Sequence, residues 1–415
     1  MARFRELLHK VKNNEFQFYR QVAVIVALLS IAFIYGNYAY TKLLSPQADY
    51  SKIKNSDFVN LLTGATVAKK YGVHEIYQPS IQKATQEQIT GIKYDTSFLA
   101  FRSLPIIALI YIPLSYFDVI SAFTIHLIML LMLTPFLVFA FAKVFKLSLA
   151  QISAIILFIF ISAVYFYNQS SFFLPFIILG VYACYSKNKY FCAGLIAGLL
   201  LIKTQYGIFI PLLIVFSGFK KSFFLGALAS IGFMLGTSFL LYGPSFLKDY
   251  TLFMIQSESL GFGTVEIINY NLFGLKALLN QVIGLTIPGY AVLITQSILY
   301  LIALVALYTK RKNIELQQAF IDIVLLSISL NVHSLQADLI MLLVVISAGF
   351  NLHNQRNQPT KYINLLIGFI LLLPMCVMLK GVQGISGLIM IIFAFYALFK
   401  PLVGDPGLEP GTTRV

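Results

Sequence analysis

Long apolar runs separated by shorter polar segments dominate the chain. Read with a window of about 20 residues, which as a helix crosses a hydrocarbon core of roughly 30 Å, the pattern predicts about twelve transmembrane helices. These runs start near residues 21, 98, 119, 151, 172, 191, 222, 287, 315, 337, 362 and 384. Because they are too long and too uniformly apolar for the strands of a barrel, the pattern predicts an all-α polytopic membrane protein.

Two polar segments are much longer than the others, residues 41–97 and 242–288. Six predicted helices separate them, and an even number of crossings returns the chain to the same side of the membrane. A long loop suits an enzyme that works at the membrane surface. We therefore expect residues 1–400 to form one integral-membrane domain with these two segments as outer loops. Residues 401–415 contain Pro-Gly breakers and no apolar stripe, which predicts a disordered tail.

Basic residues indicate the orientation. The leader before the first apolar run carries five of them, Arg3, Arg5, Lys10, Lys12 and Arg20. This predicts a cytoplasmic N-terminus, in a multi-pass protein of the inner or plasma membrane, with both long segments on the non-cytoplasmic side. Most later basic clusters then fall inside, but those around Lys143 and Lys187 fall outside, against the rule. The conflict disappears if the apolar pattern divides one helical hairpin between residues 143 and 190 wrongly, because the corrected division would place these two loops inside.

Composition agrees with this class and narrows the function. Hydrophobic residues make up 59% of the chain and charged residues 11%, against about 25% charged in a soluble domain. The net charge of +14 then reflects topology and contact with anionic lipid rather than nucleic-acid binding. The three cysteines lie in or beside apolar runs without the spacing of a metal site or a disulfide framework. No glycine-rich phosphate loop is present, which argues against a nucleotide substrate.

Asp57 stands at a distinctive place in the first long segment. It precedes a helical stripe of apolar residues, Phe58, Leu61, Leu62, Ala65 and Val67 or Ala68. This predicts an amphipathic helix in the membrane interface, with the carboxylate near the helix N-terminus where a negative charge is favoured. Capping of that helix and catalysis are both open as roles for Asp57.

Several short motifs follow one another in an order that resembles a known family. They are an Asp-Phe pair followed by "GVHEIYQP" (Asp57, Phe58, Gly72, Tyr77, Pro79), a proline-bearing span (Pro105, Pro113), "YNQSSFFLPF" (Gln169), a small-residue run ending at Lys203, "INYNLFG" (Asn271, Gly274) and "SLNVHSLQADL" (His333, Asp338). Their order resembles the GT-C superfamily of membrane glycosyltransferases, and most closely glycosyltransferase family 87. The resemblance covers about residues 20 to 350, although each motif is short and some positions differ from the family pattern.

The resemblance implies a GT-C-like fold, with interfacial helices in the first outer loop, and a hexosyltransferase activity. The donor would be a polyprenyl-phosphate sugar, with mannose or another hexose, and the acceptor a lipid-linked or cell-envelope glycan on the non-cytoplasmic face. Such a reaction needs a base for the acceptor hydroxyl and a cation for the departing phosphate. We assign the base to Asp57. The expected substrate-binding residues are Arg102, Lys203, Tyr77, His74, Gln169, Asn271 and His333.

Arg102 and Lys203 are the candidates for holding the anion, and each has an alternative role. Arg102 could equally anchor its helix at the lipid headgroups. Lys203 lies deep in an apolar run, where an unpaired lysine costs on the order of 3 kcal/mol. Asp322 is the expected partner if Lys203 is purely structural. No His and acid cluster has the spacing of a closed metal site, which leaves a divalent cation held partly by Asp57 as an alternative.

Two other functional classes fit a polytopic chain. A transporter or flippase of lipid-linked saccharides would also place charges such as Lys203 and Asp322 near the bilayer midplane. An O-antigen polymerase or ligase would have a long outer loop too, but late in the chain and rich in arginine. Here the longest loop follows the first predicted span, which favours the glycosyltransferase.

Overall fold

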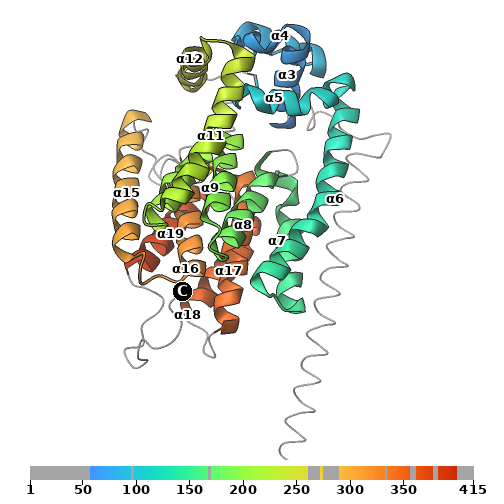
Figure 1. Cartoon of the computed structure of the whole chain (residues 1–415). Helices are drawn as coiled ribbons and strands as arrows, with labels where there is room; N and C mark the ends of the chain where they lie inside the picture. The colour runs from blue at the N-terminus through green and yellow to red at the C-terminus, as the bar shows by residue number, and fades with distance from the viewer. Residues whose placement is uncertain are drawn as a thin grey trace, which may run out of the picture.

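The computed structural model describes residues 57–94, 98–166, 170–259, 272–273, 289–331, 334–355, 361–376 and 382–399. Over these residues the protein is all-helical apart from one pair of two-residue strands, as the apolar pattern predicts. Helices α3, α4, α5 and α12 gather at one end of a bundle built from the remaining helices (Figure 1). We call this group of four helices, with η2 and η3, the cap.

The elements of the cap are α3 (Asp57–Lys70), η2 (Val73–Glu75), α4 (Pro79–Thr90), α5 (Pro105–Tyr111), η3 (Ile112–Tyr116) and α12 (Phe246–Ser259). Those of the bundle are α6 (Val119–Phe145), α7 (Leu149–Phe166), η4 (Ser170–Phe173), α8 (Leu174–Tyr185), α9 (Tyr190–Gly198), η5 (Leu199–Ile208), α10 (Phe209–Phe216), α11 (Lys221–Tyr242), α15 (Gly289–Lys310), α16 (Leu316–Ser329), η7 (Gln336–Met341), α17 (Leu342–Gln355), α18 (Lys361–Cys376) and α19 (Val382–Phe399). Strand β1 (Leu272–Phe273) pairs antiparallel with β2 (Ser334–Leu335).

Three segments of the described chain are long and apolar enough to cross a membrane: α6, Tyr190–Phe216 and α11. Five shorter apolar helices accompany them, Pro105–Tyr116, Leu149–Ile159, Ser170–Tyr185, Ile294–Lys310 and Leu316–Ser329. The helical membrane-protein class is therefore confirmed, whereas the number of about twelve transmembrane helices stays a prediction.

The cap has a hydrophobic core of its own. The predicted stripe of α3 is buried, and so are Val59 and Thr63 between its members, so α3 is enclosed by the cap instead of resting on it. Two buried glutamines of α4 fix the chain that follows: Gln82 accepts from the Phe101 amide at 2.8 Å, and Gln86 bonds both backbone groups of Leu99.

The run predicted to start a transmembrane helix near residue 98 belongs to the cap. Its helical part, Pro105–Tyr116, spans only α5 and η3 and packs against α3. Seven residues of α-helix and five of 3-10 helix rise about 20 Å together, which is less than a hydrocarbon core. Pro105 is the first residue of α5, and Pro113 is the second residue of η3, where the hydrogen-bonding pattern changes.

The segment Tyr190–Phe216 is a re-entrant hairpin: it enters the bundle and returns to the same end. Tyr185 contacts Tyr190 and Phe216 at once, with ring centroids 5.1 and 5.4 Å away, so both ends of the segment lie together. Its chain leaves helical geometry at Lys203, where φ is −121° and ψ is 91°. Lys203 therefore lies at the turning point.

Close packing of glycines holds the first arm of this hairpin. A Cβ on Gly194 would overlap the carbonyl oxygen of Phe223, and one on Gly198 would overlap the side chain of Ser230. The order of these contacts shows that α9 runs parallel to α11. Small residues let helix backbones approach this closely, as in membrane helix pairs generally.

The basic clusters meet at the end of the bundle opposite the cap. Lys220 lies 3.4 Å from the ring centre of Tyr190, Phe219 contacts Tyr308 beside Lys310, and Phe145 contacts Tyr182. The loops around Lys143 and Lys187 thus share an end with Lys220. We call it the basic end. In the structure these loops lie at the end opposite the cap, which contains the described parts of the two long segments. Which side of the membrane they face stays a prediction.

Candidate functional site

Three turning points of the chain meet between the bundle and the cap. They are η4 between α7 and α8, the bend at Lys203 between α9 and α10, and η7 between α16 and α17. Leu201 and Ile202, beside the bend, pack against the hydrophobic cores of both the bundle and the cap. Polar side chains at these turns are therefore placed at the boundary between the two parts.

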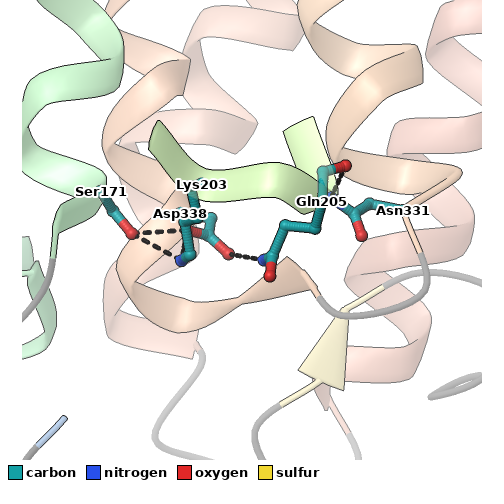
Figure 2. A network of polar contacts seen from close by, with 5 residues as sticks. All are labelled: Ser171, Lys203, Gln205, Asn331 and Asp338. Atoms are coloured by element: carbon teal, nitrogen blue, oxygen red, sulfur yellow. Dashed lines mark hydrogen bonds and ion pairs between the residues drawn. The ribbon is translucent and has the colours of Figure 1, made fainter. Parts of the chain in front are cut away.

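An ion pair links the three turns (Figure 2). Lys203 Nζ lies 2.5 Å from Asp338 Oδ1, and Ser171 Oγ donates to the same oxygen at 2.6 Å. Lys203 Nζ is also 2.8 Å from Ser171 Oγ, and Gln205 Nε2 reaches Asp338 Oδ2 at 3.5 Å. The Asp338 side chain is 0% exposed and that of Lys203 is 14% exposed. Each turn thus contributes one or two members of a buried polar network.

The backbone at these turns explains why the network forms here. Outside regular helix, backbone groups need other partners. Asn331, which follows α16, supplies one by donating from Nδ2 to the Gln205 carbonyl at 3.1 Å. This bond ties the bend at Lys203 to the turn that carries Asp338 (Figure 2).

The partner of Lys203 is Asp338 and not Asp322. Asp322 is fully buried in α16, where its Oδ1 accepts from Gln318 Nε2 at 2.6 Å one helical turn away. The expectation that a structural role for Lys203 would require Asp322 is therefore wrong, although the requirement for a buried counter-charge is confirmed. Helix α17 follows directly after η7, so Asp338 enters the site from the turn and not from a helix face.

Asp57 faces this network from the cap. It lies in the first turn of α3, and the charges of Lys203, Asp338 and Arg102 all act on its carboxyl. Burial raises the pKa of Asp57, Lys203 and Arg102 oppose that rise, and Asp338 adds to it. A buried carboxyl with a raised pKa, on which two cations act, is a candidate for a group that exchanges a proton in the reaction.

Arg102 is held by α12. Its Nη2 donates to the carbonyl of Ser257 at 3.1 Å, and its own carbonyl lies 3.3 Å from the hydroxyl of Tyr250. The same hydroxyl lies 3.0 Å from Oγ1 of Thr204, the residue after Lys203. Tyr250, one of 24 tyrosines in the chain, belongs to none of the motifs recognised in the sequence.

Tyr77 and His74 have different surroundings. Tyr77 is buried, its ring contacts those of Tyr242, Phe246, Tyr250 and Phe253, and its hydroxyl donates to the Ser103 carbonyl at 2.9 Å. Tyr77 thus joins α12 to the first part of the cap. The side chain of His74 is 64% exposed, and its Nε2 lies 3.4 Å from Oε1 of Glu75. A sugar-binding role for either stays a prediction.

Gln169, Asn271 and His333 lie outside the described residues. The residues next to the last two are paired, because Leu272 lies opposite Leu335 and Phe273 opposite Ser334. Within the described ranges, no three His, Cys, Asp or Glu side chains gather in the way a metal ion needs.

The comparisons with known proteins support the class suggested by these features. The model of glycosyltransferase family 87 matches residues 105–330. Neither the curated proteins nor the solved structures contain a match. The matched region includes α6 to α11, the re-entrant hairpin and Lys203, and it amounts to more than half of the 415 residues. The chain therefore belongs to glycosyltransferase family 87.

Proposed function

We propose that this glycosyltransferase moves a hexose, mannose being the expected sugar, from a polyprenyl-phosphate donor to a lipid-linked or cell-envelope glycan on the non-cytoplasmic face. Family membership supports glycosyl transfer. The observation that carries the finer proposal is the placement of one carboxyl, Asp57, under the influence of two cations, Lys203 and Arg102, at the boundary of cap and bundle. A lipid phosphate and an acceptor hydroxyl need this combination of charges.

In the proposed step, Asp57 removes the proton from the acceptor hydroxyl, whose oxygen then forms a bond to the anomeric carbon. The bond between that carbon and the phosphate oxygen breaks, and the polyprenyl phosphate leaves with the electron pair. Lys203 and Arg102 stabilise the negative charge that develops on the leaving phosphate. The Asp338 carboxylate fixes the position of Lys203 through the 2.5 Å contact.

Asp57 must be ionised to act as a base. Because burial raises the pKa of its carboxyl, we expect the reaction rate to rise with pH through a value above the ordinary pKa of 3.8. The rising limb of the pH profile would therefore report Asp57. Lys203 and Arg102 limit the shift of that limb to higher pH, because both cations favour the ionised form of Asp57.

The test measures release of polyprenyl phosphate from mannose-loaded polyprenyl phosphate, with a membrane lipid extract as the acceptor. Asp57→Asn keeps the shape of the side chain and should lower transfer by roughly a hundredfold or more, while binding of the donor persists. Glu75→Gln, a matched change elsewhere in the cap, should leave transfer near the wild-type rate. If Asp57→Asn retains most of the activity, Asp57 is not the base.

A further inference from the structure

Tyr250 connects the two chain segments that carry the cations of the site. Its hydroxyl lies 3.0 Å from Thr204 Oγ1 and 3.3 Å from the carbonyl oxygen of Arg102. Thr204 is adjacent to Lys203 in the sequence. A phenol can donate one hydrogen bond while it accepts another, so both contacts can be made at once.

Among the described residues, α12 packs against the rest of the protein through one face. Phe246, Tyr250 and Phe253 contact the ring of Tyr77, whereas Leu247 and Ile255 on the opposite side are 58% and 60% exposed. Packing of these aromatic rings holds α12 against the cap, but it is not directional and does not orient α12 relative to Lys203 and Arg102. The directional contacts come from the Tyr250 hydroxyl and from the Ser257 carbonyl that accepts from Arg102.

We propose that Tyr250 is a positioning residue for the transfer reaction: its hydroxyl sets the spacing of the Lys203 bend and the Arg102 segment around Asp57. This inference rests on the proposed function. Tyr250 contacts the backbone carbonyl of Arg102 and the side chain of Thr204, the neighbour of Lys203. Its effect on the reaction is therefore exerted through Arg102 and Lys203. The packing of its ring against Tyr77 is a separate role that a phenylalanine would keep.

The electrostatic consequence gives the inference a specific signature. Coulomb energy varies inversely with distance, so small outward shifts of Lys203 and Arg102 weaken their hold on the Asp57 carboxylate. Asp338 also acts on Asp57 and would then raise the pKa of Asp57 with less opposition. On the neighbouring α6, His126 contacts Phe58 with the two rings tilted and their centroids 5.0 Å apart, and this contact would not change.

Tyr250→Phe is the decisive variant, and Tyr242→Phe is its matched control. Tyr242 belongs to the same aromatic group, and its hydroxyl bonds Asp249 Oδ2 at 3.2 Å instead of the site. With mannose-loaded polyprenyl phosphate as the donor, Tyr250→Phe should lower kcat/KM by roughly five- to tenfold. It should also move the rising limb of the kcat/KM pH profile to higher pH. Tyr242→Phe should change neither quantity, and both variants should unfold thermally near the wild-type temperature.

Thr204→Val removes one of the two contacts from the other side. We expect the same shift of the pH profile, and we expect the double variant with Tyr250→Phe to be little worse than Tyr250→Phe alone. An unchanged pH limb in Tyr250→Phe, or an equal loss in Tyr242→Phe, would overturn the inference. Asp57→Asn separates this outcome from failure of the proposed function: if it remains inactive while Tyr250→Phe resembles the wild type, only the role of Tyr250 is wrong.

Discussion

Replacing Lys203 by methionine should destabilise the protein as well as inactivate it. Methionine has a similar volume and no charge, so the change leaves the Asp338 carboxylate, 0% exposed, without its counter-ion. Removing one partner of a buried ion pair costs about 3–5 kcal/mol, because the remaining charge stays in a poor solvent. Ser171 and Gln205 continue to donate to Asp338, so we expect a value near the lower end, about 3 kcal/mol.

A second change isolates the cause of that loss. Lys203→Met combined with Asp338→Asn removes the stranded charge while keeping the size of both side chains, so it should restore most of the lost stability. Thermal unfolding of the purified proteins in one detergent measures both effects, and the transfer assay should find the single and double variants equally inactive. An unfolding temperature for Lys203→Met equal to that of the wild type would refute the argument. So would a double variant as unstable as the single one.

The remaining predictions concern packing, titration and topology. Gly194→Ala should lower the unfolding temperature markedly, because its Cβ would overlap a backbone carbonyl of α11, whereas Gly232→Ala, with nothing within 4 Å, should be neutral or slightly stabilising. Burial raises the pKa of Asp57 in the folded state, so the contribution of Asp57 to stability is fully present below its unfolded-state pKa and is lost as pH rises through its folded-state pKa. Asp57→Asn should therefore equal or exceed the wild type in thermal stability at neutral pH. A lower thermal stability of Asp57→Asn at that pH would contradict the sign of this effect. Single cysteines at Lys83 and Lys248, in a cysteine-free background, should both react with an impermeant thiol reagent in intact cells, and protection of only one would break the expected topology.

The sequence pattern located most helices but could not tell which of them cross the membrane. The runs predicted near residues 119 and 222 correspond closely to α6 and α11. The runs near 98 and 191 are equally apolar, yet one lies in the cap and the other turns back at Lys203. A re-entrant segment needs the same apolar surface as a spanning one, so hydropathy cannot separate them. If neither segment crosses the membrane, the two long loops still share a side, and the loops around Lys143 and Lys187 fall on the cytoplasmic side, in agreement with the charge rule.

The sequence could predict those residues of the candidate site whose charge is costly to place where the apolar pattern puts it. Asp57 and Lys203 were identified because each charge needed a reason for its place. The sequence could not show that Lys203 pairs with Asp338 and not with Asp322. That contact joins residues 135 positions apart and depends on how three turns meet in space. Tyr250 gave no signal at all, because its role depends on two hydrogen bonds and not on its residue type.

The re-entrant hairpin also constrains how the protein is made. During synthesis, the 27-residue apolar segment Tyr190–Phe216 reaches the membrane before α11, the helix that its glycines pack against, exists. The counter-ion for Lys203 is added only after a further 135 residues have been translated. Until then, burying Lys203 without a counter-ion costs on the order of 3 kcal/mol, which favours keeping the lysine at the water boundary. We therefore expect the final seating of this hairpin to be a late event of biogenesis, after the segment from α16 to α17 has been made, so that the bundle does not assemble strictly in the order of translation.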